Sequence, residues 1–245
     1  MIPEPATFAL VLLASFAGSV IGGIGGFGTG VVLVAVLVPI VGVKTVVPVL
    51  AVAGVLINGG RAWFYRAHVD WRATRTVLLW SLPFLVAGTQ IYLRLDPKHL
   101  GLLIGTVVLA SVPVRRVLKA REIRIGARGL AAGGAVFGLA NGFASGVGVI
   151  LVSLLLGAGL SGQAVLATDA LISIGIDVAR ALLFGKFALL DAEAALLGLA
   201  IGLATLPGSA LAAFLVRRMH ARLHILFMEA LILAGGALIV VNSLR

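Results

Sequence analysis

Residues 22–30 decide the fold and read Gly22-Gly23-Ile24-Gly25-Gly26-Phe27-Gly28-Thr29-Gly30. They lie inside an apolar run over residues 6–43, and six of the nine are glycine. Each glycine costs a helix interior about 1 kcal/mol relative to alanine, so we expect an interrupted helix here. Interrupted backbone at membrane depth is tolerated only where it is buried in protein or lines a polar cavity. The amides freed at the start of the second half-helix can bind an anion, so the stretch predicts a substrate cradle.

Two other interpretations of this stretch stay open. Gly23, Gly25 and Gly28 match the dinucleotide-binding pattern G-x-G-x-x-G. That pattern requires a preceding strand and an acidic residue about 20 positions later, whereas the next acid here is Asp70. The second interpretation is close helix packing through small residues, as in small-xxx-small contacts.

The composition is that of an integral membrane protein. Of 245 residues, 61% are hydrophobic and 11% are charged, whereas soluble domains carry about 25% charged residues. Apolar runs of helix-spanning length recur along the chain, so we predict an all-α, multi-pass protein of the cell (inner) membrane, with the lipid bilayer as its surroundings. The absence of cysteine excludes a disulfide framework and a thiolate metal site.

The net charge of +10 is explained by membrane topology. Most Lys and Arg residues lie in short loops between apolar runs, which is typical of the positive-inside rule. We therefore expect no nucleic-acid partner. The most hydrophilic segment, residues 119–128, is interpreted as a basic cytoplasmic linker.

This linker separates two halves that resemble each other, a first transmembrane repeat at residues 1–118 and a second at residues 129–245. Each repeat has about four hydrophobic segments, and the first segment of each is broken by glycine. Residues 137–148 correspond to residues 16–28, and Asp177-x-x-Arg180 corresponds to Asn58-x-x-Arg61. Internal repeats with interrupted helices at matching positions indicate a secondary transporter.

Two membrane topologies are open for the glycine-broken segments. If each crosses the membrane once, the repeats are parallel. If each is re-entrant, the repeats are inverted. The distribution of basic residues fits inverted repeats slightly better, and inverted repeats are common in transporters.

The repeated pattern resembles the sulfite exporter TauE/SafE family, also called the toluene sulfonate uptake permease (TSUP) family. The resemblance extends from Phe16 to about Val241. The chain departs from the family pattern at Phe27, where many members have glycine, and at Ala144-Ser145-Gly146, which lacks a glycine run. The motifs that carry the resemblance lie at residues 23–28, Pro39, residues 65–72, residues 167–169, residues 185–187 and residues 206–209, the last leading to Arg217-Arg218.

The resemblance implies transport of a small sulfur-containing anion, such as sulfite or an organosulfonate. We expect alternating access around a site between the two repeats. An anion channel and a non-transporting membrane scaffold are the alternatives. No nucleophile elbow, HExxH or Walker A motif is present, so we predict neither an enzyme nor a cofactor. A homo-oligomer is compatible with the sequence.

Polar groups inside apolar spans are costly, and this makes them candidates for the site. Arginine offers a planar fork for oxyanions, and Ser, Thr, Asn and glycine amides add neutral donors. No histidine has metal-ligand spacing, and no catalytic residue is predicted. The candidates for substrate binding are Gly25, Gly26, Gly28, Thr29, Asn58, Arg61, Asn141, Ser145, Gly146, Thr168 and Arg180. The candidates for coupling are Asp169, Asp177 and Glu229.

The two arginines are expected to differ. Asp177 and Arg180 are one helical turn apart and can neutralise each other. Arg61 has no acid within a turn, so it either extends to the headgroups or faces an anion, and we expect it to attract substrate more strongly. Asp169 and Glu229 either bind protons during coupling or are satisfied polar residues in helix packing.

Overall fold

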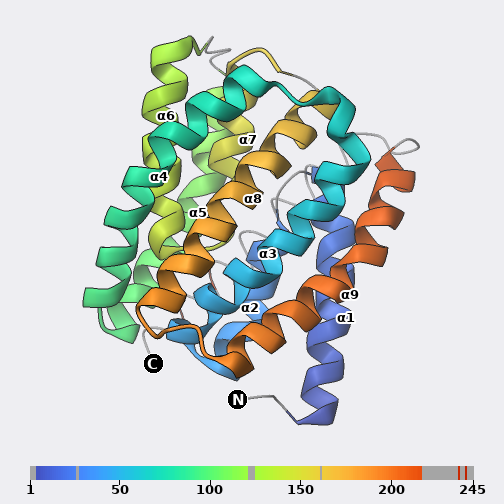
Figure 1. Cartoon of the computed structure of the whole chain (residues 1–245), viewed down its shortest axis with the longest axis vertical. Coiled ribbons are helices and arrows are strands. Elements are labelled where there is room, and N and C mark those ends of the chain that lie inside the picture. The colour runs from blue at the N-terminus through green and yellow to red at the C-terminus, as the bar shows by residue number, and fades with distance from the viewer. Residues whose placement is uncertain are drawn as a thin grey trace.

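The computed structural model describes residues 4–25, 28–120, 125–160 and 162–216, together with residues 237 and 241. Helices make up nearly all of this part of the chain, which confirms the predicted all-α class (Figure 1). A short 3-10 helix, Arg66–His68, follows α3. The α-helices are α1 (Pro5–Gly25), α2 (Thr29–Val41), α3 (Val43–Tyr65), α4 (Trp71–Arg94), α5 (Pro97–Ala120), α6 (Ala127–Phe143), α7 (Gly148–Gly157), α8 (Gln163–Lys186) and α9 (Ala192–Val216).

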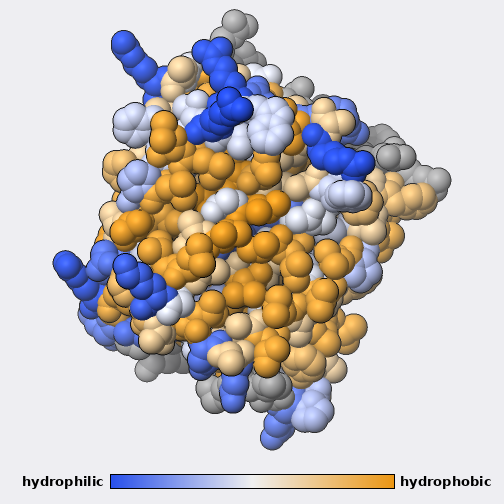
Figure 2. Space-filling model, in the orientation of Figure 1, coloured by the Kyte–Doolittle hydropathy of each residue, from blue (hydrophilic) through white to orange (hydrophobic). Residues whose placement is uncertain are grey.

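Four of the described helices, α1, α3, α4 and α9, are long and apolar enough to cross a membrane. Large apolar side chains on the outside remain exposed, among them Leu13, Leu79 and Leu182. Figure 2 shows a broad hydrophobic face with hydrophilic residues gathered toward its ends. A soluble protein would hide such a surface, whereas a lipid-facing surface is expected to be apolar. The chain is therefore a multi-pass membrane protein.

Helices α3 and α8 run through the middle of the molecule and pack against each other (Figure 1). On one flank, α9 packs against α1 and α3, and on the other flank, α4 packs against α6 and α8. Small residues bring these pairs close together. A methyl group added at Gly138 of α6 would meet the backbone of Ser81 in α4, and one added at Gly208 of α9 would meet the backbone of Phe16 in α1. Within residues 22–30, a methyl group added at Gly23 would come within 2.6 Å of Ala212 Cβ in α9, so close packing through a small residue, one of the interpretations left open above, occurs at Gly23.

The helix expected to be interrupted ends at Gly25, and α2 begins at Thr29. Gly28, directly before α2, has φ 114°, a conformation that L-residues with a side chain rarely adopt. In the second half, α6 ends at Phe143 and α7 begins at Gly148, with Gly146 between them at φ 86°. Because the helix α1, and not a strand, precedes the glycines, the dinucleotide-binding interpretation is wrong.

Several predicted features lie outside the described residues. They are Gly26, Phe27, part of the basic linker, Arg217, Arg218, Glu229 and nearly all of the predicted last span, residues 223–241.

Candidate functional site

A cavity of about 100 Å³ lies between α2, α3, α8 and the segment that joins α6 to α7. Four ionisable residues are among the described residues that line it: Arg61, Asp169, Asp177 and Arg180. At most 7% of each of these residues is exposed. The uncharged described residues of the lining are Gly28, Thr29, Gly30, Leu50, Gly54, Ile57, Asn58, Phe137, Asn141, Ser145, Gly146, Val147, Gly148, Ser173 and Ile176.

Arg61, on α3, forms an ion pair with Asp169, on α8, at 2.5 Å between Nη2 and Oδ2. The expectation that Arg61 has no compensating acid is therefore wrong, because its partner lies 108 positions away in the sequence. Extension of Arg61 to the headgroups is wrong as well, since only 6% of the residue is exposed. Asp169 contributes Oδ2 to this pair, and its Oδ1 is buried with no hydrogen-bond partner among the described residues.

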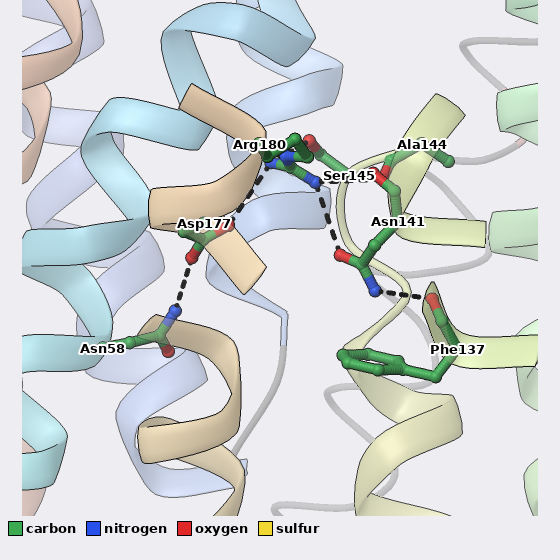
Figure 3. A network of polar contacts seen from close by, with 7 residues as sticks. All are labelled: Asn58, Phe137, Asn141, Ala144, Ser145, Asp177 and Arg180. Atoms are coloured by element: carbon green, nitrogen blue, oxygen red, sulfur yellow. Dashed lines mark hydrogen bonds and ion pairs between the residues drawn. The ribbon is translucent and has the colours of Figure 1, made fainter. Parts of the chain in front are cut away.

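Asn58 joins this ion pair to the other charged residues. Its Oδ1 accepts a hydrogen bond from Arg61 Nη2 at 2.7 Å, and its Nδ2 donates to Asp177 Oδ2 at 2.9 Å. Figure 3 shows the Asn58 side chain pointing across from α3 to Asp177 on α8. An amide can donate to one charged group and accept from the other at once. Asn58 therefore makes the four charges one connected network.

Arg180 lies at the other end of this network (Figure 3). Its Nη2 is 3.5 Å from Asp177 Oδ1 and donates to Ser145 Oγ at 3.1 Å. Its Nη1 donates to the carbonyl oxygens of Asn141 and Ala144, at 3.1 and 3.3 Å, and to Asn141 Oδ1. These carbonyls belong to the C-terminal end of α6, where a cation is favourable. The guanidinium Nε is buried with no hydrogen-bond partner among the described residues.

The N-terminal ends of α2 and α7 meet beside this network. Gly30 in the first turn of α2 lies so close to Gly146 that an added methyl carbon would be 3.1 Å from the Gly146 nitrogen. In the reverse direction, a methyl carbon added at Gly146 would be 2.7 Å from Val31 Cγ2. The first amides of each helix have no partner within that helix, so two positive helix ends border the cavity.

The structure brings most of the predicted site residues to this cavity. Gly25 is the last residue of α1 and is not among the described lining residues. Thr168 is not among them either, and its hydroxyl accepts a hydrogen bond from the Asp70 N–H at 3.0 Å. The lining residues that were predicted from sequence are Gly28, Thr29, Asn58, Arg61, Asn141, Ser145, Gly146, Asp169, Asp177 and Arg180.

Sequence reasoning missed Ser173 and Gly54. Ser173 lies four positions after Asp169 and four before Asp177, so the helical period of 3.6 places all three on one face of α8. This spacing of four residues from each aspartate is the sequence signal that could have identified Ser173. No such sequence signal exists for Gly54, because this residue contributes no side chain and only leaves space for a neighbouring group. A methyl group added there would collide with the Asp177 carboxylate.

This arrangement suits an anion that also has an apolar part. The formal charges of the four described ionisable residues cancel, and two positive helix ends remain. Leu50, Ile57 and Ile176 supply apolar lining beside the polar groups. No group of three or more His, Asp or Glu side chains that could hold a metal ion occurs among the described residues.

A comparison with protein families gives a match to the sulfite exporter TauE/SafE family over residues 10–238. No curated protein and no solved structure matches the chain. The matched region contains all the described residues that line the cavity.

Replacing Gly54 tests the network. We expect Gly54→Ala to push the Asp177 carboxylate away from Asn58 and to destabilise the protein by about 1–3 kcal/mol, as overpacking does. Thermal unfolding of the purified protein in detergent measures this. Gly59→Ala is the matched control on the same helix, because a methyl group there meets nothing within 4 Å. Equal transition temperatures for the two variants would show that the position of Asp177 does not depend on Gly54.

Proposed function

We propose that this chain, which belongs to the sulfite exporter TauE/SafE family, is a secondary transporter for a small sulfur-containing anion. The family is one of membrane transporters of sulfur anions. The substrate of our proposal is sulfite or an organosulfonate. Its binding site is the cavity between α2, α3, α8 and the segment that joins α6 to α7.

The observation that carries this proposal is the set of buried donors around the cavity. A sulfonate or sulfite group presents three oxygens and needs several donors at once. Arg180, Ser145 and Gly148, the first residue of α7, line the cavity, and Arg180 is hydrogen-bonded to Ser145. Thr29 and Gly30, in the first turn of α2, line it as well. Charge-assisted hydrogen bonds of this kind are the strong ones in proteins, and helix N-termini add favourable potential.

Arg180, and not Arg61, is the arginine that we assign to substrate binding. Arg61 is already in direct contact with the Asp169 carboxylate. Arg180 is 3.5 Å from its acid, and its other acceptors are uncharged oxygens. An incoming anion gains more at the cation whose charge is less closely compensated. This reverses the assignment made from sequence.

The helix pairing supports the proposed repeat. Helix α1 of the first half packs on α9 of the second, and α6 of the second half packs on α4 of the first. The remaining long helices with matching sequence positions, α3 and α8, pack on each other. This exchange is what two repeats related by a pseudo-two-fold axis produce. We propose that the two flanks, α1 with α9 and α4 with α6, move relative to each other and open the cavity to alternate sides.

Proton coupling is a further part of the proposal. Asp169 and Asp177 line the cavity and lie within one network with both arginines. Protonation of either carboxylate would leave its arginine more available to an anion. A proton and an anion would then cross the membrane together, as in proton symport.

Flux measurements on proteoliposomes test the binding site. Wild-type uptake of radiolabelled sulfite or methanesulfonate is expected to saturate, whereas flux through a channel would not. Arg180→Lys keeps the charge but loses the planar fork, and we expect it to raise KM about tenfold or more, which corresponds to ~1.4 kcal/mol of binding free energy. Arg72→Lys, at an exposed position, is the control and should leave KM unchanged. An unaltered KM for folded Arg180→Lys would remove Arg180 from the substrate site.

Flux under an imposed pH gradient tests coupling. The wild type should respond to the gradient, and Asp169→Asn or Asp177→Asn should abolish that response, because one of these carboxylates carries the proton. Asp191→Asn is the control, since Asp191 is exposed and binds the Ala194 N–H at the start of α9. A wild-type flux that is indifferent to the gradient would leave both buried acids with a structural role.

A further inference from the structure

The cavity contains a nearly balanced set of charges, and this limits the charge of what it can bind. Arg61 and Arg180 carry one positive charge each, and Asp169 and Asp177 one negative charge each. Arg61 forms an ion pair with Asp169 at 2.5 Å, and Arg180 forms one with Asp177 at 3.5 Å. The formal charge of the described lining is therefore zero.

The surplus positive potential comes from the helix ends. The N-terminus of a helix is equivalent to roughly half an elementary charge, so α2 and α7 together supply at most about one. The C-terminal carbonyls of α6 oppose this, but Arg180 occupies two of them, at Asn141 and Ala144. The unpartnered Arg180 Nε and the Ser145 hydroxyl add donors without adding net charge. One negative charge would be compensated, whereas a second would have no counter-charge among the described residues.

We infer that this site selects singly charged oxyanions and rejects doubly charged ones of the same shape, and that Asp177 sets this preference. Of the proposed substrates, sulfite would then bind as the hydrogensulfite monoanion. The inference rests on the proposed function, since it concerns the same cavity. An uncompensated charge away from water is costly, so the penalty for a dianion is large. Asp177 is the acid that decides, because it forms the ion pair with Arg180, and at 3.5 Å this pair is longer than the 2.5 Å pair of Arg61 with Asp169. With the Asp177 charge removed, the described lining would have one net positive charge more and could hold a dianion.

Three anions built on an SO₃ group separate charge from shape. Methanesulfonate and sulfamate are monoanions with a methyl and an amino group, respectively, and sulfate is the dianion of the same size. Titration calorimetry on the purified protein at neutral pH measures all three. We expect both monoanions to bind at least about tenfold more tightly than sulfate. Sulfamate separates the effect of charge from that of the methyl group. If the preference came only from the apolar lining, methanesulfonate would bind tightly, whereas sulfamate would bind as weakly as sulfate.

The variant Asp177→Asn should narrow or reverse the preference, with a gain of about tenfold or more for sulfate relative to methanesulfonate. Asp191→Asn, which neutralises an exposed carboxylate, should leave the ratio unchanged. Sulfate binding as tight as that of the two monoanions would overturn the inference and leave the anion site in place. Failure of all three anions to bind would instead contradict the proposed anion site. These wild-type results stand even if Asp177→Asn fails to fold.

Discussion

Four ionised side chains share the interior of a bundle that the bilayer surrounds, and their mutual pairing is the constraint on which the structure depends. An unpaired charge at this depth is costly, and removing one partner of a buried pair typically costs about 3–5 kcal/mol. Asp169 therefore needs Arg61, and Asp177 needs the Asn58 amide and Arg180. The Arg61–Asp169 and Asn58–Asp177 contacts tie α3 to α8 at the centre of the molecule.

Glycine makes this arrangement sterically accessible in two different ways. At Gly138 and Gly208 it brings helices close together, as small residues do in membrane proteins. At Gly28 and Gly146 it supplies the positive φ angles that precede α2 and α7. The glycines in close helix contacts allow the flanking helices to pack tightly. The glycines with positive φ allow the N-terminal ends of α2 and α7 to lie at the cavity. The chain is rich in glycine because both requirements recur along it.

The sequence predicted the membrane class, and most of its candidate site residues lie around one cavity. It could do so because polar residues and clustered glycines are conspicuous in apolar spans. It failed on the pairing of Arg61. Helical spacing reveals partners within one turn, such as Asp177 for Arg180, but says nothing about an acid on another helix. Only the packing of α3 on α8 brings Asp169 to Arg61. Because this contact compensates the charge of Arg61, we assign substrate binding to Arg180 and not to Arg61.

The chain contains no cysteine, so one introduced thiol reports on the cavity without background. Ser173 lines the cavity between the two aspartates of α8, and the Ser173→Cys variant places the thiol there. The most direct test is the rate at which a membrane-impermeant thiol reagent modifies this variant in oriented vesicles, from each side, with and without methanesulfonate. An alternating substrate site predicts modification from both sides and slower modification when methanesulfonate is bound. Modification from one side only, at a rate that methanesulfonate does not change, would contradict it.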